Sequence, residues 1–135
     1  MTKPVRPRRP VWIDERDALA IHDRVLGLEG RPAGVRDHAL LQSALAKPRQ
    51  LHAYGDNPDI VDMAAAYAIG IIRDHPFLDG TKRTGFVIGV LFLEINACHF
   101  NATEEAAAQI ILSLAAGTMS DDAFAAWMRA NVKRQ

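Results

Sequence analysis

Apolar residues recur every three or four positions along most of this chain, which is the spacing of helices with one buried face. Asp14 is placed to cap a helix that ends near Gly30. The positions that share the apolar face of this helix are Leu19, Ile21, His22, Val25 and Leu26. A second run follows Pro58 and comprises Ile60, Met63, Ala64, Tyr67, Ala68 and Ile71. No segment alternates as a strand does, so the pattern predicts an all-α fold.

Residues 84–95 are apolar on nearly every face. Because such a helix must be covered on all sides, we expect it to be the central buried helix of a helical bundle. Three more helices are expected after the capping residues Asp37, Thr103 and Ser120. The first of them should stop at Pro48, with a loop over residues 49–58, because proline removes a helical hydrogen bond.

Length and composition limit the chain to one domain. Its 135 residues, of which 49% are hydrophobic, can enclose one hydrophobic core but not two. We assign this domain to residues 12–135. Residues 1–11 are rich in proline and in cations, a composition that resists compact packing, so we expect them to form a flexible basic arm.

Charge and hydropathy restrict the possible partners. Sixteen basic residues balance sixteen acidic ones, so no overall field draws the chain to nucleic acid or to an anionic membrane. The longest uncharged apolar stretch, residues 85–93, is far shorter than the roughly 20 residues of a membrane span. The single cysteine, Cys98, suits a reducing compartment. We therefore expect a cytoplasmic protein that binds neither nucleic acid directly nor a membrane.

The candidate chemistry is concentrated in residues 75–83, which read His-Pro-Phe-Leu-Asp-Gly-Thr-Lys-Arg. Apolar segments flank this stretch, so the polar loop should be held by buried helices. The loop precedes the first turn of the expected central helix, whose unpaired N–H groups and positive dipole end attract anions. Gly80, Thr81 and Lys82 at this turn would form an anion cradle, and phosphate is the anion we expect there.

Four side chains of this loop supply the parts of a phosphoryl-transfer site. His75 can take a proton from an attacking hydroxyl near neutral pH. Asp79 offers a carboxylate oxygen to Mg²⁺, and Lys82 with Arg83 adds fixed positive charge. The loop is not a Walker P-loop, because the glycine is not followed by a Gly-Lys pair and the surrounding sequence is not rich in strands.

Residues 75–83 resemble the signature of the Fic/Doc superfamily. Fic-type adenylyltransferases typically carry His-Pro-Phe-x-x-Gly-Asn-Gly-Arg-x-x-Arg, whereas here the second glycine is replaced by Lys82 and the last arginine by Phe86. Both differences resemble the death-on-curing, or Doc, branch. Segments within residues 21–48 are also similar to that branch.

The resemblance implies an all-α, single-domain toxin that a Phd-like antitoxin neutralises. It also implies that the toxin moves the γ-phosphate of ATP, with Mg²⁺, onto a threonine hydroxyl of elongation factor Tu and so stops translation. The implied catalytic residues are His75 as general base, Asp79 as magnesium ligand, and Lys82 and Arg83 as stabilisers of phosphate charge. The implied nucleotide-binding residues are Gly80, Thr81, Lys82 and Arg73, the last because a phage member of the family also has an arginine there.

Two alternatives concern the same loop. The family usually has asparagine where this chain has Thr81, and threonine lacks the separate carbonyl and NH₂ groups of the amide. Losing one polar contact to a transition state slows a reaction by about 10²–10³-fold. One alternative is therefore a catalytically silent module that binds nucleotide and antitoxin, and the other is a Fic-type nucleotidyltransferase.

A third alternative comes from the pairs His22-Asp23 and Asp37-His38. Adjacent histidine and aspartate residues are ligands in HD-type metal phosphohydrolases. His22 lies on the apolar face of its helix, however, where a buried core histidine is the expected role, and the remaining histidines lack the spacing of a ligand set.

Overall fold

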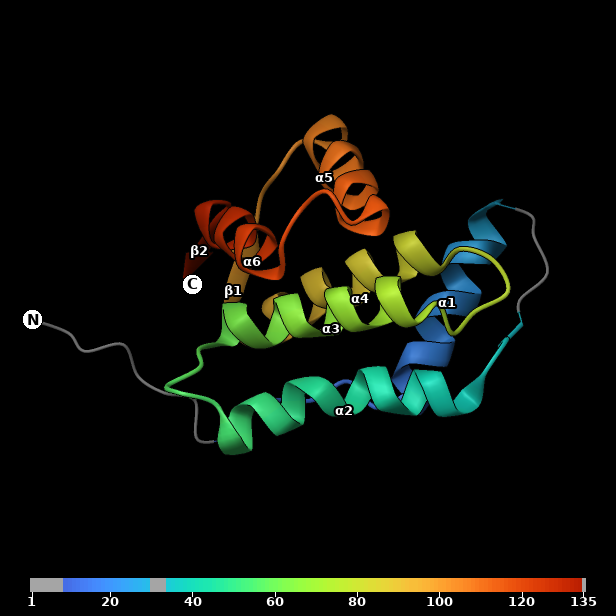
Figure 1. Ribbon diagram of the computed structural model, residues 1–135, viewed down its shortest axis with the longest axis horizontal. Coiled ribbons are helices and arrows are strands. Elements are labelled where there is room, and N and C mark those ends of the chain that lie inside the picture. The colour runs from blue at the N-terminus through green and yellow to red at the C-terminus, as the bar shows by residue number, and fades with distance from the viewer. Residues whose placement is uncertain (1–8, 30–33, 135) are drawn as a thin grey trace, which may run out of the picture.

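The computed structural model describes residues 9–29 and 34–134. Within these residues the chain forms six helices and one small antiparallel sheet, so the all-α prediction is confirmed (Figure 1). The elements are α1 (Glu15–Glu29), α2 (His38–Tyr54), α3 (Ile60–Asp74), α4 (Thr81–Ile95), β1 (Cys98–Phe100), α5 (Glu104–Ala116), α6 (Asp121–Ala130) and β2 (Val132–Arg134).

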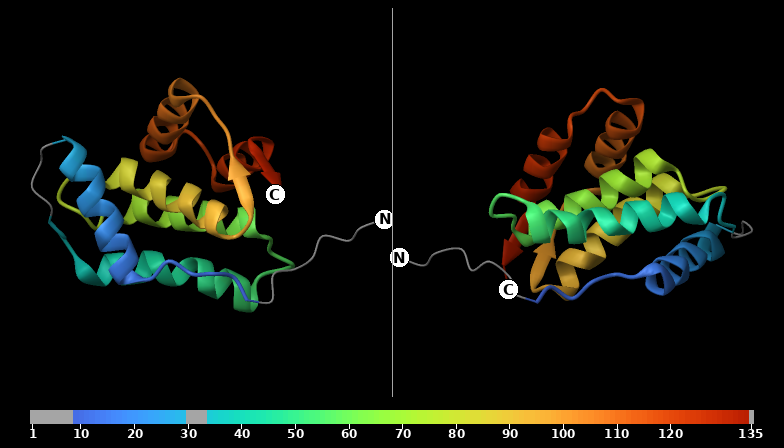
Figure 2. Two further views of the ribbon diagram at one scale, coloured as in Figure 1. Left: turned by 180° about the vertical axis from the view of Figure 1, so that it is seen from behind. Right: turned by 60° about the horizontal axis from the view of Figure 1, so that its bottom comes forward.

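Helices α3 and α4 form the centre of the fold. They lie antiparallel, with α2 along α3, and α5 and α6 cover the opposite side (Figure 1). Helix α1 packs against α4 (Figure 2). The sequence pattern predicts α4 as the central helix, but α3 is more enclosed, with ten buried residues against seven in α4. Exposed side chains of α4 lie in its first turn, at Lys82 and Arg83, and in its second half, at Leu91 and Ile95.

The two central helices approach closely at Gly89 of α4. A Cβ atom at this position would lie 3.0 Å from the carbonyl oxygen of Ala64 and 3.2 Å from the Cβ of Ala68, both on α3. A residue without a side chain is therefore favoured here. The two helices that approach here are those whose ends the 75–80 loop joins.

Helix α2 is longer than the sequence pattern predicts. Pro48 lies inside the helix, which continues to Tyr54, so the prediction of a stop at Pro48 is wrong. Of the loop predicted over residues 49–58, only residues 55–58 lie outside the helices. A proline inside a helix costs about 3 kcal/mol. The proline ring belongs to a buried face that also contains Leu41, Ala44 and Leu45. Burial of this face offsets the local cost, since most helical stability in proteins comes from such packing.

Capping hydrogen bonds confirm the other predicted helix starts. The side-chain oxygens of Asp14, Asp37, Thr103 and Ser120 each accept a hydrogen bond from the backbone N–H three residues later. At α1 the cap is reciprocal, because the N–H of Asp14 also donates to Oδ2 of Asp17 at 3.1 Å.

The sequence pattern does not predict the two strands. Each has three residues, which is too short for alternation to be recognised. Cys98 pairs with Arg134 and Phe100 with Val132, so the sheet joins the segment after α4 to the segment after α6.

Residues 1–8 of the predicted arm lie outside the described residues. Further along the predicted arm, Pro10 is buried. The N–H of Val11 donates to Oδ1 of Asn96 at 2.8 Å, and Nδ2 of Asn96 donates back to the carbonyl of Val11 at 3.0 Å. The described part of this segment is therefore attached to the end of α4.

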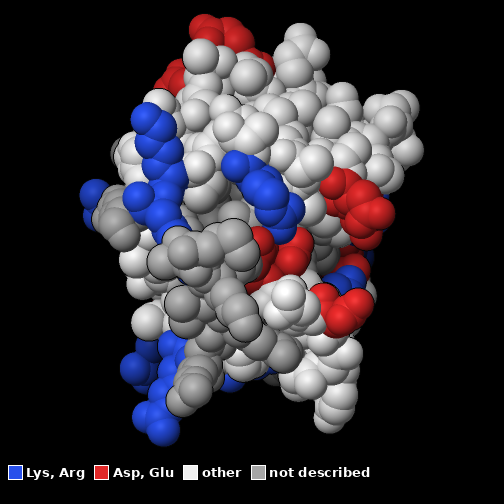
Figure 3. Space-filling model, turned by 90° about the vertical axis from the view of Figure 1, so that its left-hand side faces the viewer, with Lys and Arg blue, Asp and Glu red and all other residues white. Residues whose placement is uncertain are grey.

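Both positive and negative side chains lie on the face that Figure 3 shows, the positive ones mainly toward its left side and the negative ones mainly toward its right side. Among the described residues, no helix combines the length and the apolar character that are needed to cross a membrane.

Candidate active site

The loop of residues 75–80 joins α3 to α4 at the end of the fold where α1 and the start of α2 also lie (Figure 1). His75 ends α3 in the left-handed conformation, with φ 52° and ψ 56°, and its N–H donates to the carbonyl of Ile71 at 3.0 Å. Pro76 then cannot continue the helix. Positive φ is uncommon for residues other than glycine and recurs at functional sites. The His75 side chain is exposed at this turn.

The short segment before α2 supports the first half of the loop. Val35 and Phe77 pair in an isolated antiparallel bridge. The N–H of Leu78 donates to the carbonyl of Gly34 at 3.1 Å. These contacts connect the loop to a segment that is about forty residues away in the sequence.

Arg36 binds the end of α3 directly. Its Nε donates to the carbonyl of His75 at 2.8 Å, and its Nη2 donates to the carbonyl of Asp74 at 3.1 Å. The last carbonyls of a helix have no partner inside the helix and carry its negative dipole end. A cation therefore satisfies them well, and the backbone of His75 is held in place.

His22 of α1 supports the second half of the loop. It is 2% exposed, and its ring stacks on that of Phe77 with centroids 3.7 Å apart and planes at 9°. Its Nε2 lies 2.8 Å from the carbonyl oxygen of Asp79. Because a carbonyl can only accept, Nε2 carries the hydrogen and donates. The next residue, Gly80, has φ 73°, and a Cβ there would lie 2.7 Å from Leu26.

The polar side of the loop opens into a cavity of about 440 Å³. We call it the catalytic cavity after the roles predicted for its residues, and it is lined by His75, Leu78, Asp79, Gly80, Thr81, Lys82 and Arg83. The structure thus brings together every predicted catalytic residue and all the predicted nucleotide-binding residues except Arg73. The cavity lies at the N-terminus of α4, where the helix dipole adds to the positive charge of Lys82 and Arg83.

Comparison with known families relates this loop to other proteins. The model of the Fic/DOC family matches residues 12–93, which is more than half of the chain and includes all of residues 75–83. The chain belongs to the Fic/DOC family. It is 36% identical over 93 residues to Toxin Doc of Mycolicibacterium smegmatis, covering 67% of this chain and 68% of the relative. It is 26% identical over 117 residues to Protein kinase doc of Escherichia phage P1, covering 87% of this chain and 92% of the relative.

Thr81 lies in the first turn of α4 and is one of the predicted nucleotide-binding residues. It is 3% exposed, and its hydroxyl donates to the carbonyl of Phe77 at 3.3 Å. The hydroxyl therefore joins the first turn of α4 to the loop that precedes it.

Arg73 does not line the catalytic cavity of this Fic/DOC chain, in contrast to its predicted role in phosphate binding. Its guanidinium is paired with Asp121 at the start of α6, and Nη2 donates to the carbonyl of Met119 at 3.4 Å. Arg73 belongs to the last turn of α3, whereas His75 follows the helix in the left-handed conformation. In this structure Arg73 connects α3 to α6.

A larger groove adjoins the Fic/DOC catalytic cavity. It lies between α4 and α5, has a volume of about 570 Å³ and shares Lys82 and Arg83 with the cavity. Most of its other lining residues are apolar, among them Phe86 and Ile111. The two spaces thus meet at the two cations.

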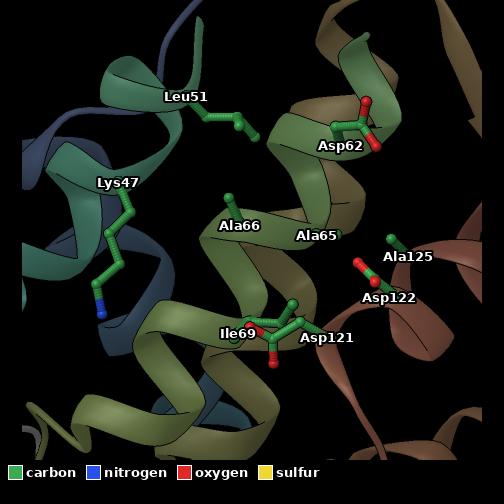
Figure 4. Close-up of a pocket in the computed structure, with 9 residues that line it drawn as sticks. All are labelled: Lys47, Leu51, Asp62, Ala65, Ala66, Ile69, Asp121, Asp122 and Ala125. Carbon is green, nitrogen blue, oxygen red and sulfur yellow. The ribbon is translucent and has the colours of Figure 1, made fainter. Parts of the chain in front are cut away.

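A third groove lies across α3 between α2 and α6 (Figure 4). Its volume is about 340 Å³, and small and apolar side chains form much of its lining. Two of its carboxylates, Asp62 and Asp121, are paired with Arg129 and Arg73. This groove contains none of the predicted Fic/DOC site residues.

The pairs His22-Asp23 and Asp37-His38 do not form a metal site in this Fic/DOC fold. Asp37 caps α2, and Nδ1 of His38 lies 3.9 Å from Glu15. Among the side chains that the structure describes, no group of three His, Cys, Asp or Glu residues is arranged to hold a metal ion. The phosphohydrolase alternative therefore has no ligand set within this part of the chain.

Sequence reasoning did not identify the two side chains that hold the Fic/DOC loop, His22 and Arg36. His22 is 57 residues from its partner Asp79, and Arg36 is 39 residues from His75. Local spacing cannot reveal such distant pairs. The available signal is a histidine on the apolar face of α1, for which the sequence favours core packing over metal binding.

Proposed function

We propose that this Fic/DOC protein is a toxin that transfers the γ-phosphate of ATP to a hydroxyl group of a target protein. The observation that carries the proposal is that His75, Asp79, Lys82 and Arg83 surround one cavity at the N-terminus of α4. The names of two similar proteins, a toxin and a protein kinase, support both parts of the proposal.

The proposed reaction uses the loop residues as follows. The hydroxyl oxygen of the target attacks the γ-phosphorus, a P–O bond forms, and the hydroxyl proton passes to His75. The bond between the γ-phosphorus and the bridging oxygen breaks, and ADP leaves with the electron pair. Lys82, Arg83 and the N–H groups of the first turn of α4 stabilise the charge on the phosphate oxygens. His75 then releases its proton to solvent.

Asp79 fits a magnesium ion that is shared with the nucleotide. Mg²⁺ is usually bound by one or two carboxylates, with phosphate oxygens and water completing its shell. Asp79 provides the carboxylate that lines the catalytic cavity. Among the described residues no cluster of three ligands exists, so a cage made only of protein groups is not the expected arrangement. When bound, the ion would neutralise phosphate charge.

The nucleoside of ATP needs space beside the phosphates. The α4–α5 groove of about 570 Å³ adjoins the catalytic cavity at Lys82 and Arg83, and its apolar lining suits a purine ring. Our proposal therefore seats the triphosphate at the N-terminus of α4 and the nucleoside between α4 and α5.

Elongation factor Tu is the proposed target, with a threonine hydroxyl as acceptor, and a Phd-like antitoxin is the proposed partner. Both follow from the resemblance to Doc toxins. The proposed cellular result is arrest of translation until the antitoxin binds.

A labelling experiment tests this function. The purified chain is incubated with elongation factor Tu and ATP that carries a label on the γ-phosphate or, in a second tube, on the α-phosphate. His75→Ala removes the proposed base, and His38→Ala is the matched control, because His38 is an exposed histidine outside the catalytic cavity. We expect γ-label on the target, retained in the control and reduced about 10²-fold or more in His75→Ala. Transfer of α-label would instead establish nucleotidyl transfer.

A second candidate function is a catalytically silent module that binds nucleotide and antitoxin. The observation that favours it is Thr81, because its hydroxyl already donates to the carbonyl of Phe77 and a hydroxyl cannot replace an amide. Nucleotide binding measured by calorimetry, without transfer of either label, would support this candidate and contradict the kinase proposal.

A further inference from the structure

We infer that His22 is a positioning residue of the catalytic loop, which fixes the orientation of the peptide bond between Asp79 and Gly80. The catalytic consequence of this inference rests on the proposed function, whereas the positioning itself rests on the geometry of the loop.

His22 is held rigidly in the core. Its side chain is 2% exposed, and its ring lies parallel to the fully buried ring of Phe77, 3.7 Å away. The ring cannot turn without displacing Phe77 from the core. The hydrogen on Nε2 is therefore directed at one fixed point, the carbonyl oxygen of Asp79 at 2.8 Å.

The Asp79 carbonyl and the Gly80 N–H belong to the same peptide bond. The described residues contain no cis peptide bond, and in a trans peptide these two groups point in opposite directions. Because the carbonyl points to His22 in the core, the N–H points away from α1. There it donates to Oδ1 of Asp79 at 2.8 Å. Both ends of this peptide unit are thus hydrogen-bonded.

Without the His22 donor, this peptide would lose the hydrogen bond at its carbonyl end and could rotate more easily. Gly80 sits at φ 73° and, as a glycine, can adopt backbone conformations that are closed to other residues. Rotation would turn the Asp79 carbonyl toward the catalytic cavity, where its partial negative charge repels phosphate. It would also remove the hydrogen bond that holds the Asp79 carboxylate. His22 prevents both changes.

Two substitutions separate positioning from ordinary core packing. His22→Phe keeps an aromatic ring that can stack on Phe77 but removes the donor to Asp79. His22→Gln removes the ring but keeps an N–H donor at a similar distance from the backbone. A packing role predicts that the phenylalanine variant functions better, whereas a positioning role predicts that the glutamine variant does.

The decisive experiment measures three properties of these variants: the affinity for inorganic triphosphate, the NMR resonance of the Gly80 amide, and the rate of γ-phosphate transfer. We expect His22→Phe to weaken triphosphate binding and to slow transfer by about tenfold or more, and to shift the Gly80 resonance. We expect His22→Gln to recover most of each loss. Val25→Ala is the control, since it removes buried packing on the same helix and should lower the melting temperature without these effects.

The inference is overturned if His22→Phe binds triphosphate as the unaltered chain does and leaves the Gly80 resonance unchanged. The proposed function can fail separately. Absence of phosphate transfer would contradict the kinase proposal. If the Gly80 resonance and the triphosphate affinity still depended on the donor at position 22, the positioning role would nevertheless be supported.

Discussion

Nε of Arg36 donates a hydrogen bond to the carbonyl oxygen of His75 at 2.8 Å, although the two residues are 39 positions apart. Arg36 precedes α2, whereas His75 ends α3. The contact therefore connects the first third of the chain to the proposed catalytic base, and it holds the backbone of that base in the left-handed conformation.

Arg36→Lys tests this contact. Lysine keeps the charge but lacks the planar arrangement of donors that reaches two carbonyls at once. We expect transfer to slow by about tenfold, because the base is displaced. ATP affinity should change little, and the free energy of unfolding should fall by about 1 kcal/mol. Turnover and denaturant unfolding measure these effects. The control is Arg24→Lys, at an exposed position of α1. Normal turnover of Arg36→Lys would show that the reaction does not need the contact between Arg36 and His75.

Thr81→Asn tests whether the departure from the family signature limits the reaction. Asparagine restores the amide, so we expect phosphate transfer to rise by up to about 10²-fold. Thr81→Val is the comparison, because it keeps the shape but leaves the carbonyl of Phe77 without the hydroxyl donor. That loss should lower the free energy of unfolding by about 1–2 kcal/mol. An unchanged rate in Thr81→Asn would show that the threonine is not the limiting feature.

Gly89→Ala tests the close approach of α3 and α4. The added methyl group would meet the backbone oxygen of Ala64 at 3.0 Å, and the backbone cannot move as a flexible side chain can. We expect the free energy of unfolding to fall by about 1–3 kcal/mol. Gly27→Ala is the matched control, for which we expect the free energy of unfolding to change in the opposite direction. Gly27 lies in α1 with open space around it, so alanine should stabilise the chain by up to about 1 kcal/mol. Thermal unfolding of both variants measures the difference.

Asp59→Asn tests the acid dependence of stability. Burial by itself raises the pKa of Asp59. The hydrogen bond from the Asp62 backbone lowers it, as do the hydrogen bond and the charge of Arg129, and together these effects hold the pKa below its ordinary value. Such a group stabilises the fold above its unfolded-state pKa of about 4, and the contribution is lost as the pH falls through the lower folded-state value.

Asparagine keeps a capping side chain at position 59 but cannot form the ion pair with Arg129. At pH 7 we expect Asp59→Asn to be less stable than the unaltered chain by about 1 kcal/mol or less, since the pair is partly exposed. The difference should shrink as the pH falls below about 4. Urea unfolding at several pH values checks this, with the exposed Asp56→Asn as control. A difference that is independent of pH would contradict the assignment.

The sequence by itself determined the helical class, the helix starts and the place of the chemistry. A helix cap such as that of Ser120 depends on residues three positions apart, and the apolar face of α3 on residues three or four positions apart. Both patterns can therefore be recognised in the sequence. The 75–83 signature is also continuous. For this reason the proposed catalytic residues could be named before the structure brought them around one cavity.

Only the tertiary structure decided how that loop is held and which local rules are overridden. Burial of its apolar face allows α2 to continue past Pro48, and Arg73 forms an ion pair with Asp121. His22 and Arg36 donate hydrogen bonds to carbonyls of residues that are distant in the sequence. The energies of these contacts depend on surfaces that exist only once the helices have assembled, and no spacing of neighbouring residues encodes them.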